Sequence, residues 1–288
     1  MRHSDPVHRS PPRQLSAAAL TAALDAGGLA VVYQPVVDLR SGHVVAAEAL
    51  ARLRLPDSAV LLPPSAFLPT AEKHGLVGRL DAMVADLAIR QAARWREATG
   101  ERPFSIGINV SVADLDDSAL PFRMQALCAE AGLPLDALVV EVTETLLSVE
   151  GRGHEDVLRS LAALGVNVTM DDFGTGFSSL AYLKRFPVKG IKIDRSFTWD
   201  LDTDPDLTVA LVRFGRDLGM HVVAEGVETE SQLQALCQAG CPFAQGYLFS
   251  PPLPAAELTA LLDRRFVLPR PVAVPLPRTG TAGLPSPR

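Results

Sequence analysis

Short apolar runs that resemble strands alternate with helical patterns along most of the chain, and this alternation limits the possible folds more than any other feature. Amphipathic segments lie between most of the runs, for example at 79–98, 154–164, 206–219 and 229–239. The candidate strands are 30–37, 43–53, 104–111, 137–143, 166–172, 190–194, 221–226 and 243–247. This order of about eight strands with helices between them predicts an α/β fold, either a barrel or a doubly wound sheet.

The first two candidate strands are joined only by "DLRSGH", which is too short for a helical crossover. We therefore expect these two strands to form an antiparallel hairpin. No linker is apparent inside residues 16–267, so this segment is predicted to be one domain. Residues 1–15 are expected to be a flexible arm, and the proline-rich residues 268–288 a disordered tail.

Composition excludes several classes of protein. The net charge of −6 gives no overall attraction to a nucleic acid polymer or an anionic membrane. Three cysteines do not make a disulfide framework, and scattered histidines without an HExxH pair argue against a histidine-based zinc site. No apolar run is long enough to predict a membrane span, and no secretory signal is present at the N-terminus, so we expect a cytoplasmic protein.

Acidic and amide side chains occur in or directly after the apolar runs. They are Glu48, Asn109, Glu141, Glu144, Asp171, Asp172, Asp194, Glu225 and Glu228, accompanied by Lys192. A charge in a buried strand is costly unless it is paired or binds a metal. One such acid is explained by an ion pair, but acids on several strands are better explained by a shared site at the carboxyl ends of barrel strands.

An all-oxygen ligand set favours Mg²⁺ or Mn²⁺ over zinc. The adjacent Asp171 and Asp172 allow one aspartate to bridge two metals, an arrangement that is common in phosphodiester hydrolysis. Glu48, Leu50 and Arg52 are spaced two apart, so they share one face of their strand. An arginine on the same face as a metal ligand is suited to a bidentate contact with phosphate.

Eight segments together resemble the EAL-domain family of cyclic-di-GMP phosphodiesterases. In chain order they are "YQPVVDL", "EALAR", "INVS", "EVTE", "DDFGTGFSSL", "KIDRSF", "AEGVETE" and "QGYLFSPPL", and they cover about residues 30–253. The resemblance implies a modified TIM (β/α)8 barrel with an antiparallel first strand. It also implies metal-dependent hydrolysis of cyclic di-GMP to linear pGpG, in the context of bacterial signalling.

The resemblance also assigns roles to individual residues. It implies that Glu48, Asn109, Glu141 and Asp171 hold one metal, and that Asp171 and Asp172 hold a second. Lys192 and Glu225 would act on the attacking water, and Glu144 would brace the loop after Asp172. The implied substrate-binding residues are Gln34, Leu50, Arg52, Asp194 and Gln245. Gln245 and Glu228 would also contact the metal-binding residues from outside the metal site.

Structural alternatives stay open for some of these residues. Glu144 and Glu228 are equally explained as structural residues, and Asp194 is explained by local pairing with Arg195. Lys192 is also explained as an ion-pair partner of a neighbouring acid. Gln34 is also explained as a partner of backbone groups.

The sequence departs from the family after "EAL", where Ala51 and Leu53 replace the usual aliphatic and aromatic residues. Both fall on the strand face opposite Glu48, so we expect altered packing with the chemistry kept. Because the ligand and base positions are filled, an active enzyme is favoured over a binding-only receptor or a scaffold. The expected cofactors are two Mg²⁺ or Mn²⁺ ions, with Ca²⁺ binding without turnover. The expected partners are cyclic di-GMP, a second copy in a homodimer and an unknown regulatory protein.

Overall fold

A computed structural model describes residues 15–56, 58–100, 102–148, 153–175 and 179–269. The predictions for the N-terminal arm and the proline-rich tail fall largely outside these residues. The strands are β1 Leu29–Asp38, β2 Val44–Arg54, β3 Leu61–Leu62, β4 Ser105–Asn109, β5 Leu138–Thr143, β6 Asn167–Phe173, β7 Gly190–Ile193, β8 His221–Ala224 and β9 Phe243–Ala244. The α-helices are α1 Ala17–Asp25, α2 Pro64–Lys73, α3 Val77–Thr99, α4 Val112–Leu115, α5 Leu120–Ala131, α6 Glu144–Ser148, α7 His154–Ala163, α8 Ser179–Arg185, α9 Arg195–Trp199, α10 Pro205–Asp217, α11 Glu230–Ala239 and α12 Ala255–Thr259.

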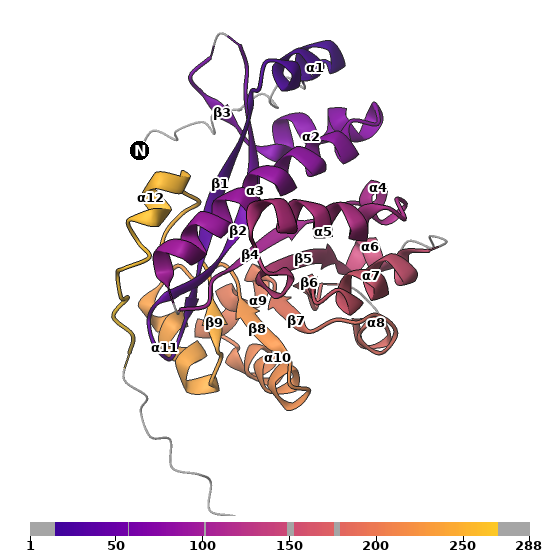
Figure 1. The fold of residues 1–288 in the computed structure, drawn as a ribbon. Coiled ribbons are helices and arrows are strands. Elements are labelled where there is room, and N and C mark those ends of the chain that lie inside the picture. Colours follow the sequence, from indigo (N-terminus) through magenta and orange to yellow (C-terminus); the bar gives the residue numbers. More distant parts are fainter. Residues whose placement is uncertain (1–14, 57, 101, 149–152, 176–178, 270–288) are drawn as a thin grey trace, which may run out of the picture.

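The strands form a closed barrel. The order is β1-β9-β8-β7-β6-β5-β4-β2, with β1 pairing back to β2, and β3 extends the edge of β2. β1 runs antiparallel to both neighbours and β3 runs antiparallel to β2, whereas the pairs β2–β4, β4–β5, β5–β6, β6–β7, β7–β8 and β8–β9 are parallel. The predicted modified TIM barrel and its antiparallel first hairpin are therefore confirmed. Figure 1 shows the helices around the outside of the sheet.

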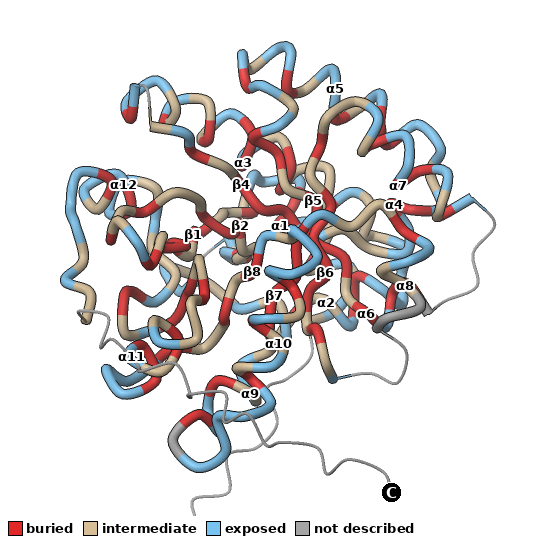
Figure 2. Tube along the Cα trace, turned by 90° about the horizontal axis from the view of Figure 1, so that it is seen from below, coloured by how far each residue is buried: buried red, intermediate tan, exposed pale blue. Residues whose placement is uncertain are grey.

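Successive side chains of each strand point alternately outward, toward the helices, and inward, into the barrel. On β4 and β5, the outward residues Ile106, Ile108, Val140 and Val142 are buried under the helices. Figure 2 shows buried strand residues in the middle and exposed residues on outer helices such as α5 and α10. The intervening residues point into the barrel, so the polar side chains of different strands face one shared interior.

The unusual Ala51 and Leu53 are accommodated by the hydrophobic core. Leu53 is fully buried, and Ala51 is half-buried against the same core. Trp95 of α3 belongs to the same core and packs edge-on against both Tyr33 and Phe104. Its indole N–H donates to Thr259 Oγ1 at 2.8 Å. This hydrogen bond ties α3 to α12 across the β1 side of the barrel.

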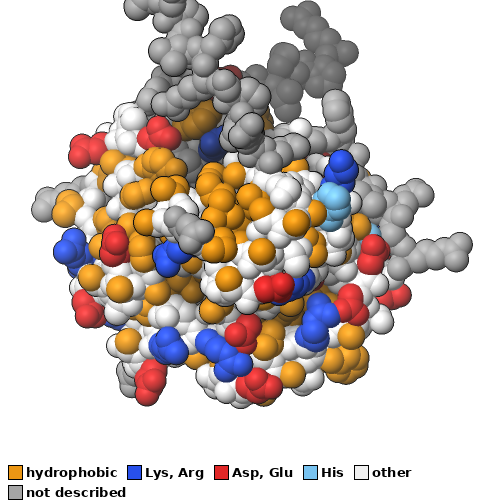
Figure 3. Space-filling view, turned by 90° about the horizontal axis from the view of Figure 1, so that it is seen from above, with side chains coloured by type: hydrophobic (Ala, Val, Ile, Leu, Met, Phe, Trp, Pro, Cys, Tyr) orange, Lys and Arg blue, Asp and Glu red, His pale blue; other side chains and the backbone are white. Residues whose placement is uncertain are grey.

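Among the described residues, no helix is both long and hydrophobic enough to cross a membrane. Figure 3 shows one face on which hydrophobic side chains gather in the middle and charged side chains lie mainly around the edge. The large exposed hydrophobic residues include Val60, Phe122 and Tyr247.

Candidate active site

Lys192 is the centre of a buried cluster of charges inside the barrel. The side chain comes from β7 and is only 2 % exposed. Its Nζ lies 2.9 Å from Glu48 Oε2, 3.0 Å from Glu141 Oε2, 3.3 Å from Asp171 Oδ1 and 2.7 Å from Glu225 Oε1. One ammonium group therefore contacts carboxylates from β2, β5 and β6 and from the segment directly after β8.

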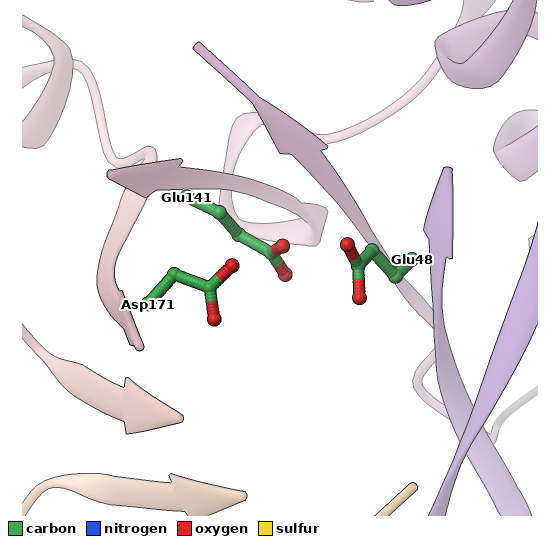
Figure 4. Close-up of side chains that lie close together, drawn as sticks. All are labelled: Glu48, Glu141 and Asp171. Atoms are coloured by element: carbon green, nitrogen blue, oxygen red, sulfur yellow. The ribbon is translucent and has the colours of Figure 1, made fainter. Parts of the chain in front are cut away.

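The strand register explains why these side chains meet. Glu48 pairs with Gly107 across β2 and β4, and Asn109 pairs with Glu141 across β4 and β5. Residues paired across parallel strands lie side by side, and those facing inward share the same height in the barrel. Figure 4 shows the carboxylates of Glu48, Glu141 and Asp171 turned toward one another from three strands.

Asp171 and Asp172 reach this region together because the strand is irregular. Adjacent residues of a regular strand point to opposite faces. Here the β6–β7 register shifts between Met170 and Phe173, and Asp172 has a φ of 53°, in the left-handed region that a non-glycine residue rarely adopts. The Asp172 N–H donates to Asp171 Oδ1 at 3.0 Å. Backbone strain of this kind gathers at functional sites.

Glu48 has the most hydrogen-bond donors of the cluster. Asn109 Nδ2 donates to Glu48 Oε1 at 3.0 Å, while Gln245 Nε2 and Lys192 Nζ donate to Oε2, both at 2.9 Å. Burial alone would raise the pKa of Glu48, but Lys192 and these hydrogen bonds lower it. Gln245 Nε2 also donates to Glu225 Oε1 at 3.2 Å, so one amide links the two glutamates.

The cluster holds more negative than positive charge. Burial, together with the neighbouring Glu48 and Asp171, raises the pKa of Glu141 well above its usual value despite Lys192. Burial raises the pKa of Glu225 to about 8, and burial with the nearby Asp171 raises the pKa of Asp172. Burial alone would lower the pKa of Lys192, but the surrounding carboxylates raise it well above normal.

The donor set fits divalent cations with oxygen ligands. Carboxylate oxygens of Glu48, Glu141 and Asp171 lie within 4.8 Å of one another, and so do those of Asp171, Asp172 and Glu225. The two groups share Asp171, as expected for neighbouring sites bridged by one carboxylate. Cations bound there would offset the excess negative charge that one lysine leaves in a buried space.

Several predicted substrate-binding residues lie beside the cluster. Gln34 of β1 is directly opposite Glu48 in the hairpin register, and Leu50 and Arg52 follow on β2, both half-buried. The Arg52 guanidinium donates to the Ala51 carbonyl at 2.8 Å. Burial lowers the pKa of Arg52, and the phenol of Tyr247 partly opposes this effect. Tyr247, which the sequence analysis did not single out, therefore belongs to the same neighbourhood.

The other predicted residues lie outside the contacts around Lys192. Asp194 is the N-cap of α9 and accepts a hydrogen bond from the Ser196 N–H at 3.0 Å. Arg195 does not pair with it, and its guanidinium lies over the Trp199 ring at 5.0 Å. The Asp194 charge nevertheless contributes to the raised pKa of Asp172, so the two acids are neighbours.

The two remaining glutamates have different environments. Glu144 is buried at the first position of α6, directly after β5, and is 4 % exposed. Glu228 is exposed just before α11, and its backbone N–H donates to Gln232 Oε1 at 2.8 Å.

Gly107 is a feature of the site that the sequence analysis missed. A Cβ atom at this position would lie 2.3 Å from Glu141 Oε1, so only glycine leaves room for that carboxylate. The available signal was a glycine at an inward position of β4, beside the strand that carries an inward glutamate.

These observations define an α/β-barrel protein with a candidate divalent-metal site at the carboxyl ends of its parallel strands. The family model described as "EAL domain" matches residues 17–252. The chain therefore belongs to the EAL domain family.

The relatives by sequence are longer proteins in several cases. The chain is 38% identical over 244 residues to MucR of Pseudomonas aeruginosa, named as a bifunctional diguanylate cyclase/cyclic di-GMP phosphodiesterase, with 84% of this chain and 35% of that protein covered. It is 37% identical over 250 residues to the uncharacterised Mb1392c of Mycobacterium bovis, with 84% and 81% covered. The chain thus spans about a third of the length of MucR.

Solved structures with the same fold include domains bound to a cyclic dinucleotide. The structure titled PaMucR phosphodiesterase, c-di-GMP complex, is 38% identical with a TM-score of 0.77, covering 84% of this chain and 98% of that chain. The EAL domain of Pseudomonas aeruginosa FimX bound to c-di-GMP is 28% identical with a TM-score of 0.74, covering 82% and 95%.

Proposed function

We propose that the protein is a phosphodiesterase that hydrolyses cyclic di-GMP to linear pGpG with two bound Mg²⁺ or Mn²⁺ ions. The observation that carries this proposal is that two sets of three acidic residues, both of which include Asp171, lie beside the buried Lys192. Membership of the EAL domain family and the similarity to MucR, whose structure contains c-di-GMP, support the choice of substrate.

Glu48, Asn109, Glu141 and Asp171 would hold one metal ion, and Asp171 with Asp172 would hold the other. When bound, two such ions supply a hydroxide nucleophile at neutral pH and offset charge on the phosphate during displacement. Glu48 is held in place by a hydrogen bond from Asn109, a fellow ligand, and by one from Gln245, which lies outside the proposed ligand set. Outer contacts of this kind orient metal ligands.

Lys192 and Glu225 are proposed to act on the attacking water. They contact each other at 2.7 Å, and Gln245 holds the same glutamate from a second side. Glu225 would position the water and accept its proton, while the ammonium group would hold the water or a phosphate oxygen. Glu144 is proposed to brace the loop after Asp172, and Glu228 to support the same region from the start of α11.

The substrate would lie over Gln34, Leu50 and Arg52, with Gln245 below it and Asp194 at the edge beside Asp172. The Arg52 guanidinium has one hydrogen bond to a backbone carbonyl and no carboxylate partner among the described residues, so it retains donors for a phosphate. A homodimer, a regulatory partner and a cytoplasmic location stay predictions.

Replacing Glu225 by glutamine is expected to lower the turnover of cyclic di-GMP by about 100-fold or more while changing binding little. Glutamine keeps the size and the hydrogen bonds but does not accept the proton. Turnover would be measured with Mg²⁺ and binding by calorimetry with Ca²⁺, which is expected to bind without supporting turnover. Glu230→Gln, on exposed α11, is the matched control. Equal turnover in the Glu225 variant and this control would contradict the proposed role.

Replacing Gly107 by alanine is expected to push the Glu141 carboxylate away from Lys192, because the new Cβ would lie 2.3 Å from Oε1. We expect a loss of about 1–3 kcal/mol in the free energy of unfolding and about 10-fold or greater loss of Mg²⁺ affinity. Thermal melts with and without Mg²⁺ would measure both. Gly78→Ala is the control, since nothing lies within 4 Å of a Cβ there. Unchanged metal affinity in Gly107→Ala would show that Glu141 is not a ligand.

A further inference from the structure

A cavity lies inside the barrel below the charged cluster. Its volume is approximately 390 Å³, within the range of small-molecule sites, and its inner end is formed by Glu141 and Lys192. The space exists because inward positions carry the small residues Ala46, Gly107 and Thr169. Barrels of this type are usually filled at this level by bulky branched side chains.

The cavity opens at the end of the barrel opposite the metal ligands. Ser105, Asn167 and His221 line it, and each is the first residue of its strand. The residues proposed to bind cyclic di-GMP lie toward the other end of the barrel, since Gln34 is level with Glu48 and Leu50 and Arg52 follow further along β2. This opening therefore belongs to a separate site.

Polar groups in the cavity are available to a ligand. Ser105, Thr169 and His221 line it, and within the described part of the chain their hydroxyls and ring nitrogens have no hydrogen-bond partner. Most other walls are apolar, including Val36, Val139 and Phe243. An apolar space with a few converging polar groups is the usual composition of a small-molecule site.

The charge at the mouth favours an anion. Arg40 lines the cavity and also a neighbouring groove that contains Arg216 and Arg265. The Asp38 carboxylate at the mouth already accepts hydrogen bonds from the Arg40 N–H, the Ser41 N–H and the Ser41 hydroxyl. Arg40 and Arg216 form no ion pair with any carboxylate that the structure describes, so their guanidinium groups keep free donors.

The inner end has the opposite preference. Around Lys192, the carboxylates of Glu48, Glu141, Asp171 and Glu225 outnumber the single ammonium group. An anionic group placed there would be repelled. We propose that the cavity binds a small organic carboxylate, with its apolar body inside the barrel and its carboxylate at Arg40.

The probe for this site is benzoate, tested by calorimetry on the full chain without cyclic di-GMP or metal. We expect saturable binding with a Kd of about 1 mM or tighter, and at least about tenfold weaker binding of neutral benzyl alcohol. Absence of saturable benzoate binding would overturn the proposal. Equal binding of the alcohol would overturn the assignment of the site to an anion.

Two variants locate the bound probe. Arg40→Gln is expected to weaken benzoate binding about tenfold, because it removes the charge at the mouth. Ser105→Leu is expected to abolish binding by filling the entrance, and circular dichroism would check its fold. Arg94→Gln, exposed on α3 and lining neither the cavity nor the groove, is the matched control. Wild-type affinity in Arg40→Gln would overturn the proposal even if the Ser105 variant does not fold.

Discussion

Replacing Glu48 by alanine is expected to reduce the turnover of cyclic di-GMP by more than about 100-fold. Glu48 accepts hydrogen bonds from Asn109 of β4, Lys192 of β7 and Gln245 of the segment after β9. Its loss would remove a proposed metal ligand and leave those three donors without their shared acceptor. Turnover at saturating Mg²⁺ would be measured, because a binding defect alone would be compensated there.

The fold is expected to survive this change. Removing one acid from an acidic cluster also relieves repulsion, so the cost in stability is partly offset. Glu48→Gln, which keeps the side-chain volume, tests charge separately from packing. Glu72→Ala, at an exposed position of α2, is the matched control. A folded Glu48→Ala variant with the turnover of this control would show that Glu48 is not a metal ligand.

Replacing Lys192 by methionine is expected to have the largest effect on stability. Lys192 contacts four carboxylates and is 2 % exposed, so its removal leaves buried negative charges without their direct cationic partner. Breaking a buried ion pair from one side typically costs about 3–5 kcal/mol. For a domain of this size that corresponds to a fall in Tm of roughly 10 °C without metal.

Divalent cations give this prediction a second readout. Mg²⁺, Mn²⁺ or Ca²⁺ bound among the same carboxylates would replace part of the lost positive charge. Metal is therefore expected to raise the Tm of Lys192→Met by more than it raises the Tm of the wild type. Lys189→Met, at an exposed position just before β7, is the control. If metal raises the Tm of both variants equally, the carboxylates around Lys192 do not form the metal site.

Much of the barrel could be predicted from local patterns. The strand and helix periods and the short "DLRSGH" connection depend on neighbouring residues, so the β1–β2 hairpin followed from the sequence alone. The end of β9 was less predictable. The expected strand 243–247 stops at Ala244, and Gln245 directly follows it in irregular chain, from which its amide reaches Glu48 and Glu225.

The details of the site depend on long-range contacts that a sequence pattern does not encode. The identities of Asp171 and Asp172 predicted a site, but the bulge and the φ of 53° that place both carboxylates together arise from pairing with β7. Similarly, the need for Gly107 appears only when Glu141 of the next strand is placed beside it. Asp194 was assigned to substrate on family resemblance, and this assignment stays a prediction; its carboxylate accepts a hydrogen bond from the Ser196 N–H at the N-cap of α9.

The most direct test of the proposed function is to incubate the protein with cyclic di-GMP and either Mg²⁺ or Mn²⁺, and to separate the nucleotides by chromatography. The two sets of acidic residues that have Asp171 in common predict conversion of cyclic di-GMP to linear pGpG. This conversion is expected to be abolished when a chelator removes the metal. Binding of cyclic di-GMP with no linear product in the presence of either metal would contradict the account and identify the barrel as a receptor.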